Sequence, residues 1–130
     1  MPNINVSPHA ETWYTYQGKP LEYKARWLDS AGSLLQQADV SAITYRVYDT
    51  HTGQQSATGT PVVSASVYDT AQTDSDWPYD SGFNLKFTLP GTSFPSGNRL
   101  YQVEVLLTLA DGNTAADTIQ VHARNLYSEG

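Results

Sequence analysis

Four aspartates lie in one short segment of the chain, around the aromatic residues Trp77 and Tyr79. The segment runs from residue 67 to residue 90 and reads VYDTAQTDSDWPYDSGFNLKFTLP. Its candidate residues are Asp69, Asp74, Asp76, Asp80, Trp77 and Tyr79. Clustered carboxylates can bind a metal ion or act as an acid–base pair, and an exposed aromatic ring can stack on a sugar. The same residues could instead form only a polar connection between two strands.

A regular calcium-binding loop is excluded by the spacing of these residues. An EF-hand loop has oxygen ligands at alternate positions, a glycine at the sixth and a glutamate at the twelfth. Counting from Asp74, the fifth, sixth and twelfth positions are Pro78, Tyr79 and Leu85. An irregular Ca²⁺ site stays open as an alternative to a solvated acidic loop, and it would use three aspartates: Asp74, Asp76 and Asp80.

Nothing in the sequence indicates catalysis. A glycosidase needs two carboxylates about 5–9.5 Å apart across a cleft, one of them with a raised pKa. Aspartates in a loop rich in Ser, Thr and Gly are solvated and ionised instead. The chain has no Gly-x-Ser-x-Gly motif, and His9, His51 and His122 lack the spacing of a zinc site. We therefore expect no catalytic residue, no metal and no cofactor, and we predict that the protein is not an enzyme.

A sugar-binding module is the main alternative because the chain is rich in aromatic residues. It has nine tyrosines and three tryptophans, Trp13, Trp27 and Trp77. Trp27 shares one strand face with Leu21 and Tyr23, so we expect it in the core. Trp77 precedes a proline and lies far from any regular strand. It is predicted to cap the sandwich in preference to contacting a ligand.

The elements that position these residues are short strands. Five segments alternate apolar and polar residues and predict half-buried strands: LEYKARWLD, AITYRVYDT, FNLKFTLP, LYQVEVLLTL and TAADTIQVHA. VVSASVYD is a weaker strand with Val63, Ala65 and Val67 on one face, and ETWYTY is predicted to be an edge strand that ends at the turn QGKP. ADGN is a strong hairpin signal. About seven such strands predict one all-β sandwich.

Composition limits the possible partners and the domain count. The chain has 130 residues, a formal net charge of −6 and no cysteine. We expect a single domain over residues 13–130, preceded by an extended N-terminal arm over residues 1–12. An acidic chain with scattered Lys and Arg is not expected to bind nucleic acid. We see no signal peptide and no apolar run long enough to cross a membrane.

The order of these features resembles the immunoglobulin-like modules of tailed-phage virion proteins. The resemblance rests on YQGKPLEYKARWLDSAGSLL, VSAITYRVYDTHTG and GNRLYQVEVLLTLADGNTAADTIQVHA, and it spans about residues 16–123. It implies a single immunoglobulin-like β-sandwich of about seven antiparallel strands. The cysteine pair of antibody domains is absent, so a true immunoglobulin-superfamily domain is not implied.

The resemblance also implies a structural virion protein of the capsid decoration or cement type. Its expected partners are the major capsid protein lattice, other virion subunits and neighbouring copies of itself, and it would be assembled in the host cytoplasm and located on the virion. A tail or baseplate module and a carbohydrate-binding adhesion module are the alternatives. Aromatic residues in the arm and in the acidic loop are the expected partner-binding residues: Trp13, Tyr14, Tyr16, Trp77 and Tyr79.

Overall fold

A computed structural model describes residues 5–6, 12–75, 77 and 81–125 of the chain. The strands of the described residues are β1 (Asn5–Val6), β2 (Thr12–Tyr16), β3 (Leu21–Ala25), β4 (Trp27–Leu28), β5 (Val40–Asp49), β6 (Gln55–Gly59), β7 (Val67–Gln72), β8 (Phe83–Leu89), β9 (Arg99–Leu109) and β10 (Thr114–Arg124). Three short helical turns join them: η1 (Gln37–Asp39), α1 (Val63–Ser66) and η2 (Gly91–Ser93).

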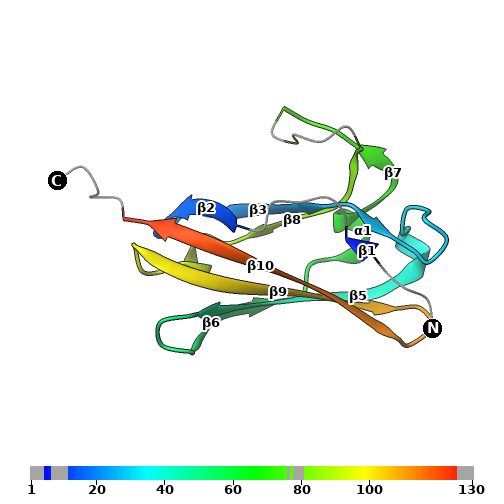
Figure 1. The fold of residues 1–130 in the computed structure, drawn as a ribbon. Coiled ribbons are helices and arrows are strands. Elements are labelled where there is room, and N and C mark those ends of the chain that lie inside the picture. The colour runs from blue at the N-terminus through cyan, green and yellow to red at the C-terminus, as the bar shows by residue number, and fades with distance from the viewer. Residues whose placement is uncertain (1–4, 7–11, 76, 78–80, 126–130) are drawn as a thin grey trace.

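The strands form two layers that face each other (Figure 1). One layer is a five-stranded sheet with the order β2-β10-β9-β5-β6, and the other is a three-stranded sheet with the order β3-β8-β7. The short β1 pairs with β4. All pairings are antiparallel except one, because β2 lies parallel to β10 at the edge of the larger sheet. The protein is an all-β, immunoglobulin-like β-sandwich, as the sequence predicted.

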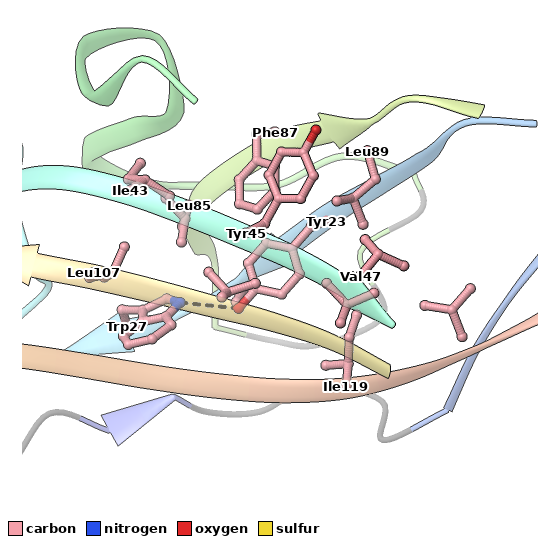
Figure 2. Packing of buried hydrophobic residues seen from close by; sticks show 14 of the residues in the cluster. Tyr23, Trp27, Ile43, Tyr45, Val47, Leu85, Phe87, Leu89, Leu107 and Ile119 are labelled. Carbon is pink, nitrogen blue, oxygen red and sulfur yellow. Dashed lines mark hydrogen bonds between the residues drawn. The ribbon is translucent and has the colours of Figure 1, made fainter. Parts of the chain in front are cut away.

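The core lies between the two sheets and is built from the apolar positions of the alternating strands (Figure 2). Every second residue of β9 from Tyr101 onward is buried, and so is every second residue at the end of β10. Burial of these side chains is the dominant favourable contribution to folding. Aromatic rings fill the middle of the core, where Tyr23 and Tyr45 both pack against Phe87 at centroid distances of 5.0 and 5.7 Å.

Tyr101, near the start of β9, forms hydrogen bonds to the loop that precedes this strand. Its ring is fully buried, and its hydroxyl accepts a hydrogen bond of 2.9 Å from the Ser96 amide and donates to the Ser96 carbonyl. A tyrosine that bonds back to the backbone a few residues upstream is a recurrent feature of immunoglobulin-like sandwiches, known as a tyrosine corner. The GNRLY segment noted in the sequence contains this residue.

The side chain of Asn84 makes hydrogen bonds to the backbone at the break between β3 and β4, where the regular strand-to-strand hydrogen bonds are interrupted. Its side chain is 1% exposed, although the alternation of β8 predicted a polar residue on the outer face. Its Oδ1 accepts a hydrogen bond of 2.7 Å from the Trp27 amide, and its Nδ2 donates to the carbonyls of Trp27 and Leu35 at 3.0 and 2.7 Å. The carboxamide thus adds hydrogen bonds to backbone groups at the break in the strand, where the Trp27 carbonyl also accepts a bond of 3.0 Å from the Leu35 amide.

Two segments differ from the sequence-based expectation. VVSASVYD, residues 62–69, was predicted to be a strand, but residues 63–66 form the helical turn α1 and only residues 67–69 join β7. The polar segment QSATG forms β6, an edge strand that the alternation pattern did not reveal. Of the expected N-terminal arm, residues 5–6 pair with β4 and Thr12 begins β2, while most of the rest lies outside the described residues.

Candidate functional site

The acidic segment between β7 and β8 is fastened to the three-stranded sheet by an ion pair. Lys24 lies on β3, and its side chain is only 7% exposed. Its ammonium contacts the Asp74 carboxylate at 2.6 Å and the Glu22 carboxylate at 3.2 Å. The sequence placed Lys24 on a solvent-facing strand surface, and the structure shows instead that Asp74 reaches across to meet it. Asp74 therefore anchors the segment.

The charge of Lys24 is maintained by these partners. Burial alone would lower the pKa of an ammonium group, because an apolar environment disfavours the charged form. The hydrogen bonds and charges of Asp74 and Glu22 outweigh this effect and raise the pKa of Lys24 above its ordinary value. The group consequently remains an ammonium at neutral pH, unsuited to act as a base.

Trp77 packs on the sandwich, as predicted. Its side chain is 9% exposed and meets Phe83 edge to face at a centroid distance of 5.3 Å. Its indole Nε1 donates a hydrogen bond to the Ser81 carbonyl. Tyr68 contacts the same Phe83 ring at 6.1 Å, so three rings form a small aromatic cluster apart from the main core. Trp77 is thus used for packing and offers little surface to a ligand.

Asp69, the other described aspartate of this segment, also has a structural partner. Asp69 accepts a hydrogen bond of 2.8 Å from the Gln37 amide, which fixes η1 against β7. Asp76, Tyr79 and Asp80 fall outside the described part of the chain, so the irregular Ca²⁺ alternative stays a prediction. Among the described residues, no three His, Asp or Glu side chains come together in a group that could hold a metal ion.

A chain of hydrogen-bonded side chains crosses the core from β4 and β3 to β10 of the five-stranded sheet. Trp27 Nε1 donates to the Tyr23 hydroxyl at 3.3 Å, and that hydroxyl donates to an Asp117 carboxylate oxygen at 2.8 Å (Figure 2 shows the first bond). Burial, and then the Asp117 charge, raises the pKa of Tyr23 well above its ordinary value. The phenol is held protonated as a donor, so this chain joins the two sheets without presenting a reactive group.

Asp49 organises the turn after β5. Its carboxylate accepts hydrogen bonds from the amides of His51 and Thr52 and pairs with the Arg99 guanidinium. Burial alone would raise the pKa of Asp49, but the His51 amide and the Arg99 charge outweigh burial and lower it below its ordinary value. This carboxylate therefore stays ionised, which suits a turn anchor and does not suit a general acid.

Among the described residues, the exposed aromatic side chains lie on β2. Tyr14 is 55% exposed and Tyr16 is 44% exposed, and both are on the outer side of the five-stranded sheet. Trp13 lies on the opposite side of the same strand, where it stacks on Tyr23 at 5.6 Å with an interplanar angle of 16°. The five expected partner-binding residues are thus divided between an exposed pair, two packed tryptophans and Tyr79, which is not described.

An arginine and a histidine of β10 stand beside Tyr14. Because the strands are parallel, Tyr14 pairs with His122 and Tyr16 with Arg124. The Arg124 guanidinium lies 4.8 Å from the centre of the Tyr14 ring, and the His122 ring meets it edge to face at 5.9 Å. We call these four residues, Tyr14, Tyr16, His122 and Arg124, the β2–β10 face. Sequence reasoning found only the tyrosines, because a parallel pairing between the first and last long strands leaves no local signal.

Comparisons with known proteins support the fold and do not assign a function. No protein-family model matches the sequence, and no curated protein matches it. CopC from Methylosinus trichosporium OB3b is similar in structure, with a TM-score of 0.51 and 15% identity over 95% of this chain and 96% of that one. Murine CRIg aligns with a TM-score of 0.41 and 10% identity over 96% and 98% of the two chains. In the described part of the chain, no helix is long and apolar enough to span a membrane.

Proposed function

We propose that the protein is a non-enzymatic structural module of a tailed-phage virion, which decorates the capsid by binding the major capsid protein lattice. The observation on which this depends is the exposed pair Tyr14 and Tyr16 on the edge strand β2. Tyrosines are enriched at the energetically dominant positions of protein interfaces, because a rigid ring buries a large area at low entropic cost.

The rest of the molecule suits a passive binding role. Three described aspartates fasten connecting segments to the sandwich: Asp49 holds the turn after β5, Asp69 holds η1 and Asp74 contacts Lys24. A sandwich fastened in this way is a rigid scaffold, and repetition on a symmetric shell multiplies modest contacts through avidity. The net charge of −6 disfavours contact with a packaged genome.

Mixing the purified protein with undecorated capsid shells tests this proposal. We expect saturable, stoichiometric attachment in a sedimentation assay. A Tyr14→Ser, Tyr16→Ser double variant should bind at least about thirtyfold more weakly, because an interface aromatic that acts as a hot spot contributes more than about 1 kcal/mol. The matched control is Tyr48→Ser, which changes a half-buried tyrosine on β5 of the same sheet.

Several outcomes would contradict this role. Protein that stays in the supernatant with every shell tested would rule out decoration. Equal loss of binding in the Tyr48 variant would show that β2 is not the docking strand. Attachment to isolated tails and not to shells would move the protein to the tail or baseplate class. The packing of Trp77 on Phe83 favours the decoration role over the adhesion alternative, because a 9% exposed ring offers little surface to a sugar.

A further inference from the structure

The two larger sheets of the described chain end at four edge strands, and three of these are protected against pairing with another chain. β6 and β7 each have a register shift against the neighbouring strand. The Ser56 hydroxyl of β6 also donates to the Ser93 carbonyl of η2 at 2.8 Å. β3 carries two charged residues, Glu22 and Lys24. Bulges, charges and covering segments are the usual means by which an edge strand avoids a foreign partner.

β2 is the fourth edge, and its sequence has none of these protections (Figure 1). Its five residues, TWYTY, include no charged residue, no proline and no glycine. Its register with β10 runs without a shift from Thr12 to Tyr16. Threonine and aromatic residues are favoured in strands, so the segment is well suited to a regular extended conformation. A regular, uncharged edge of this kind is a template for one more strand.

The backbone of β2 offers hydrogen-bonding groups on the side away from β10, which we call its outer edge. Successive residues of a strand alternate in the side toward which their amides and carbonyls point. The Gln17 amide donates to the Arg124 carbonyl at 2.8 Å, so the odd-numbered residues of β2 face β10 and the even-numbered ones face the outer edge. The Tyr16 carbonyl agrees with this direction, since it accepts a bond of 3.0 Å from the Lys19 amide in the turn.

The sequence of β2 is complementary to itself. When two copies are placed antiparallel around Tyr14, the other positions each pair an aromatic residue with a threonine: Thr12 with Tyr16, and Trp13 with Thr15. Pairs of aromatic residues, and pairs of an aromatic with a β-branched residue, stabilise neighbouring strands. Only this register pairs all five residues of both strands, and a shift toward the end of β2 would bring in the turn at Gly18, where φ is 71°.

The charges of the neighbouring β10 strands also fit this arrangement. Arg124 of one copy would lie in the same cross-strand row as Gln120 of the other, with both β2 strands between them. The two His122 side chains would share a row, with both Tyr14 residues between them. Like charges directly opposite each other destabilise a strand pair, and this register opposes none on β2.

We propose that β2 pairs with β2 of a second copy of this chain, antiparallel and across a twofold axis at Tyr14. The two Tyr14 residues exchange both backbone hydrogen bonds, and the Tyr16 amide of each copy donates to the Thr12 carbonyl of the other. The two five-stranded sheets then form one continuous sheet. Tyrosine rings project from the outer face and not from the strand edge, so the dimer presents the rings of both copies together. The pairing is a property of the chain alone and does not depend on the capsid role.

A disulfide crosslink tests the pairing. Pairing over five residues buries less than a standard interface of about 1,600 Å², so we expect a weak dimer that a covalent link makes visible. The chain has no cysteine, so a Tyr14→Cys variant reports only on its own counterpart. Directly opposed residues that share hydrogen bonds have Cα atoms about 5.5 Å apart, within disulfide range.

The matched control is Tyr48→Cys, which changes a half-buried tyrosine on β5 of the same sheet. In a glutathione redox buffer, the equilibrium constant for the disulfide-linked dimer of Tyr14→Cys should exceed that of the control at least about tenfold, because pairing raises the effective thiol concentration. Equal constants for the two variants would overturn the proposal.

A mixture of two variants tests the register. Tyr16→Cys and Thr12→Cys should each crosslink with itself no better than Tyr48→Cys, because neither residue lies opposite its own counterpart. Mixed together, they should form the mixed dimer at least about tenfold in excess of the random proportion. Random proportions in the mixture would contradict the antiparallel register centred on Tyr14.

Thr12→Pro in the Tyr14→Cys background tests the backbone hydrogen bonds. The Thr12 amide faces the outer edge, where proline is tolerated, so the melting temperature should stay close to that of the parent. Crosslinking should fall about tenfold, because proline has no amide to donate to the second copy. Undiminished crosslinking would overturn the pairing. Shell binding by a chain that fails these tests would also overturn the pairing and keep the capsid role, so the two proposals fail separately.

Discussion

Replacing Asn84 with alanine is expected to lower the free energy of unfolding by about 3–5 kcal/mol. The substitution removes three hydrogen bonds from a side chain that is 1% exposed. The Trp27 amide and the Leu35 carbonyl lose the carboxamide that satisfies them inside the protein, and each such orphaned group costs about 1–3 kcal/mol. The cavity left by the side chain adds to this loss. Urea unfolding followed by tryptophan fluorescence measures the change.

Two further variants separate hydrogen bonding from volume. Asn84→Asp has nearly the same shape but directs an oxygen toward the carbonyls of Trp27 and Leu35, so it should be as destabilising as alanine. Asn113→Ala changes an asparagine in the β9–β10 turn and should cost no more than about 0.5 kcal/mol, as surface substitutions usually do. If both Asn84 variants lower the free energy of unfolding by less than about 1 kcal/mol, the backbone at the break between β3 and β4 does not depend on this carboxamide.

Replacing Gly91 with alanine is expected to cost about 2–3 kcal/mol, because η2 and the turn after β2 touch at this residue. A Cβ on Gly91 would lie 2.1 Å from the Gly18 carbonyl oxygen and 3.2 Å from the Lys19 nitrogen. Both neighbours are backbone atoms, and the Gly18 amide is already bonded to the Phe94 carbonyl at 2.8 Å. The turn must move to admit a methyl group, and β2 would move with it.

Equilibrium unfolding gives the size of this effect, and amide hydrogen exchange gives its location. We expect faster exchange along β2 in Gly91→Ala than in the parent protein, with the centre of β9 unchanged. Thr92→Ala is the matched control, since it alters the exposed next residue of the same turn. Unaltered stability and exchange in Gly91→Ala would mean that the turn yields to the added methyl at no cost.

The alternating strands could be read from the sequence because their side-chain pattern is decided by burial. β3, β5, β8, β9 and β10 each place apolar residues on one face, and this pattern alone predicted the sandwich. β6 could not be predicted in this way. QSATG has little to bury and is held by backbone bonds to β5 at the edge of the sheet, so its sequence has no alternation to detect.

The predicted positions of two polar residues were wrong, because contacts with distant parts of the chain override the alternation of apolar and polar residues along a strand. Lys24 was assigned to solvent because it alternates with Tyr23, and only the return of Asp74 from a distant loop buries it. Asn84 was assigned to the outer face for the same reason, and the break between β3 and β4 draws it inward. In the candidate site, the two tyrosines of β2 were found from composition, whereas Arg124 and His122 required knowledge of the parallel pairing.

That parallel pairing also determines how the molecule responds to mechanical tension. β2 leads into the sandwich and β10 leads out of it, and their paired residues run in the same direction from Thr12 and Gln120 to Tyr16 and Arg124. Pulling on the two ends of the chain would slide one strand along the other, so their hydrogen bonds would share the load instead of breaking in succession. Stretching single molecules by their ends should therefore give one abrupt rupture, and gradual yielding at low force would contradict this geometry.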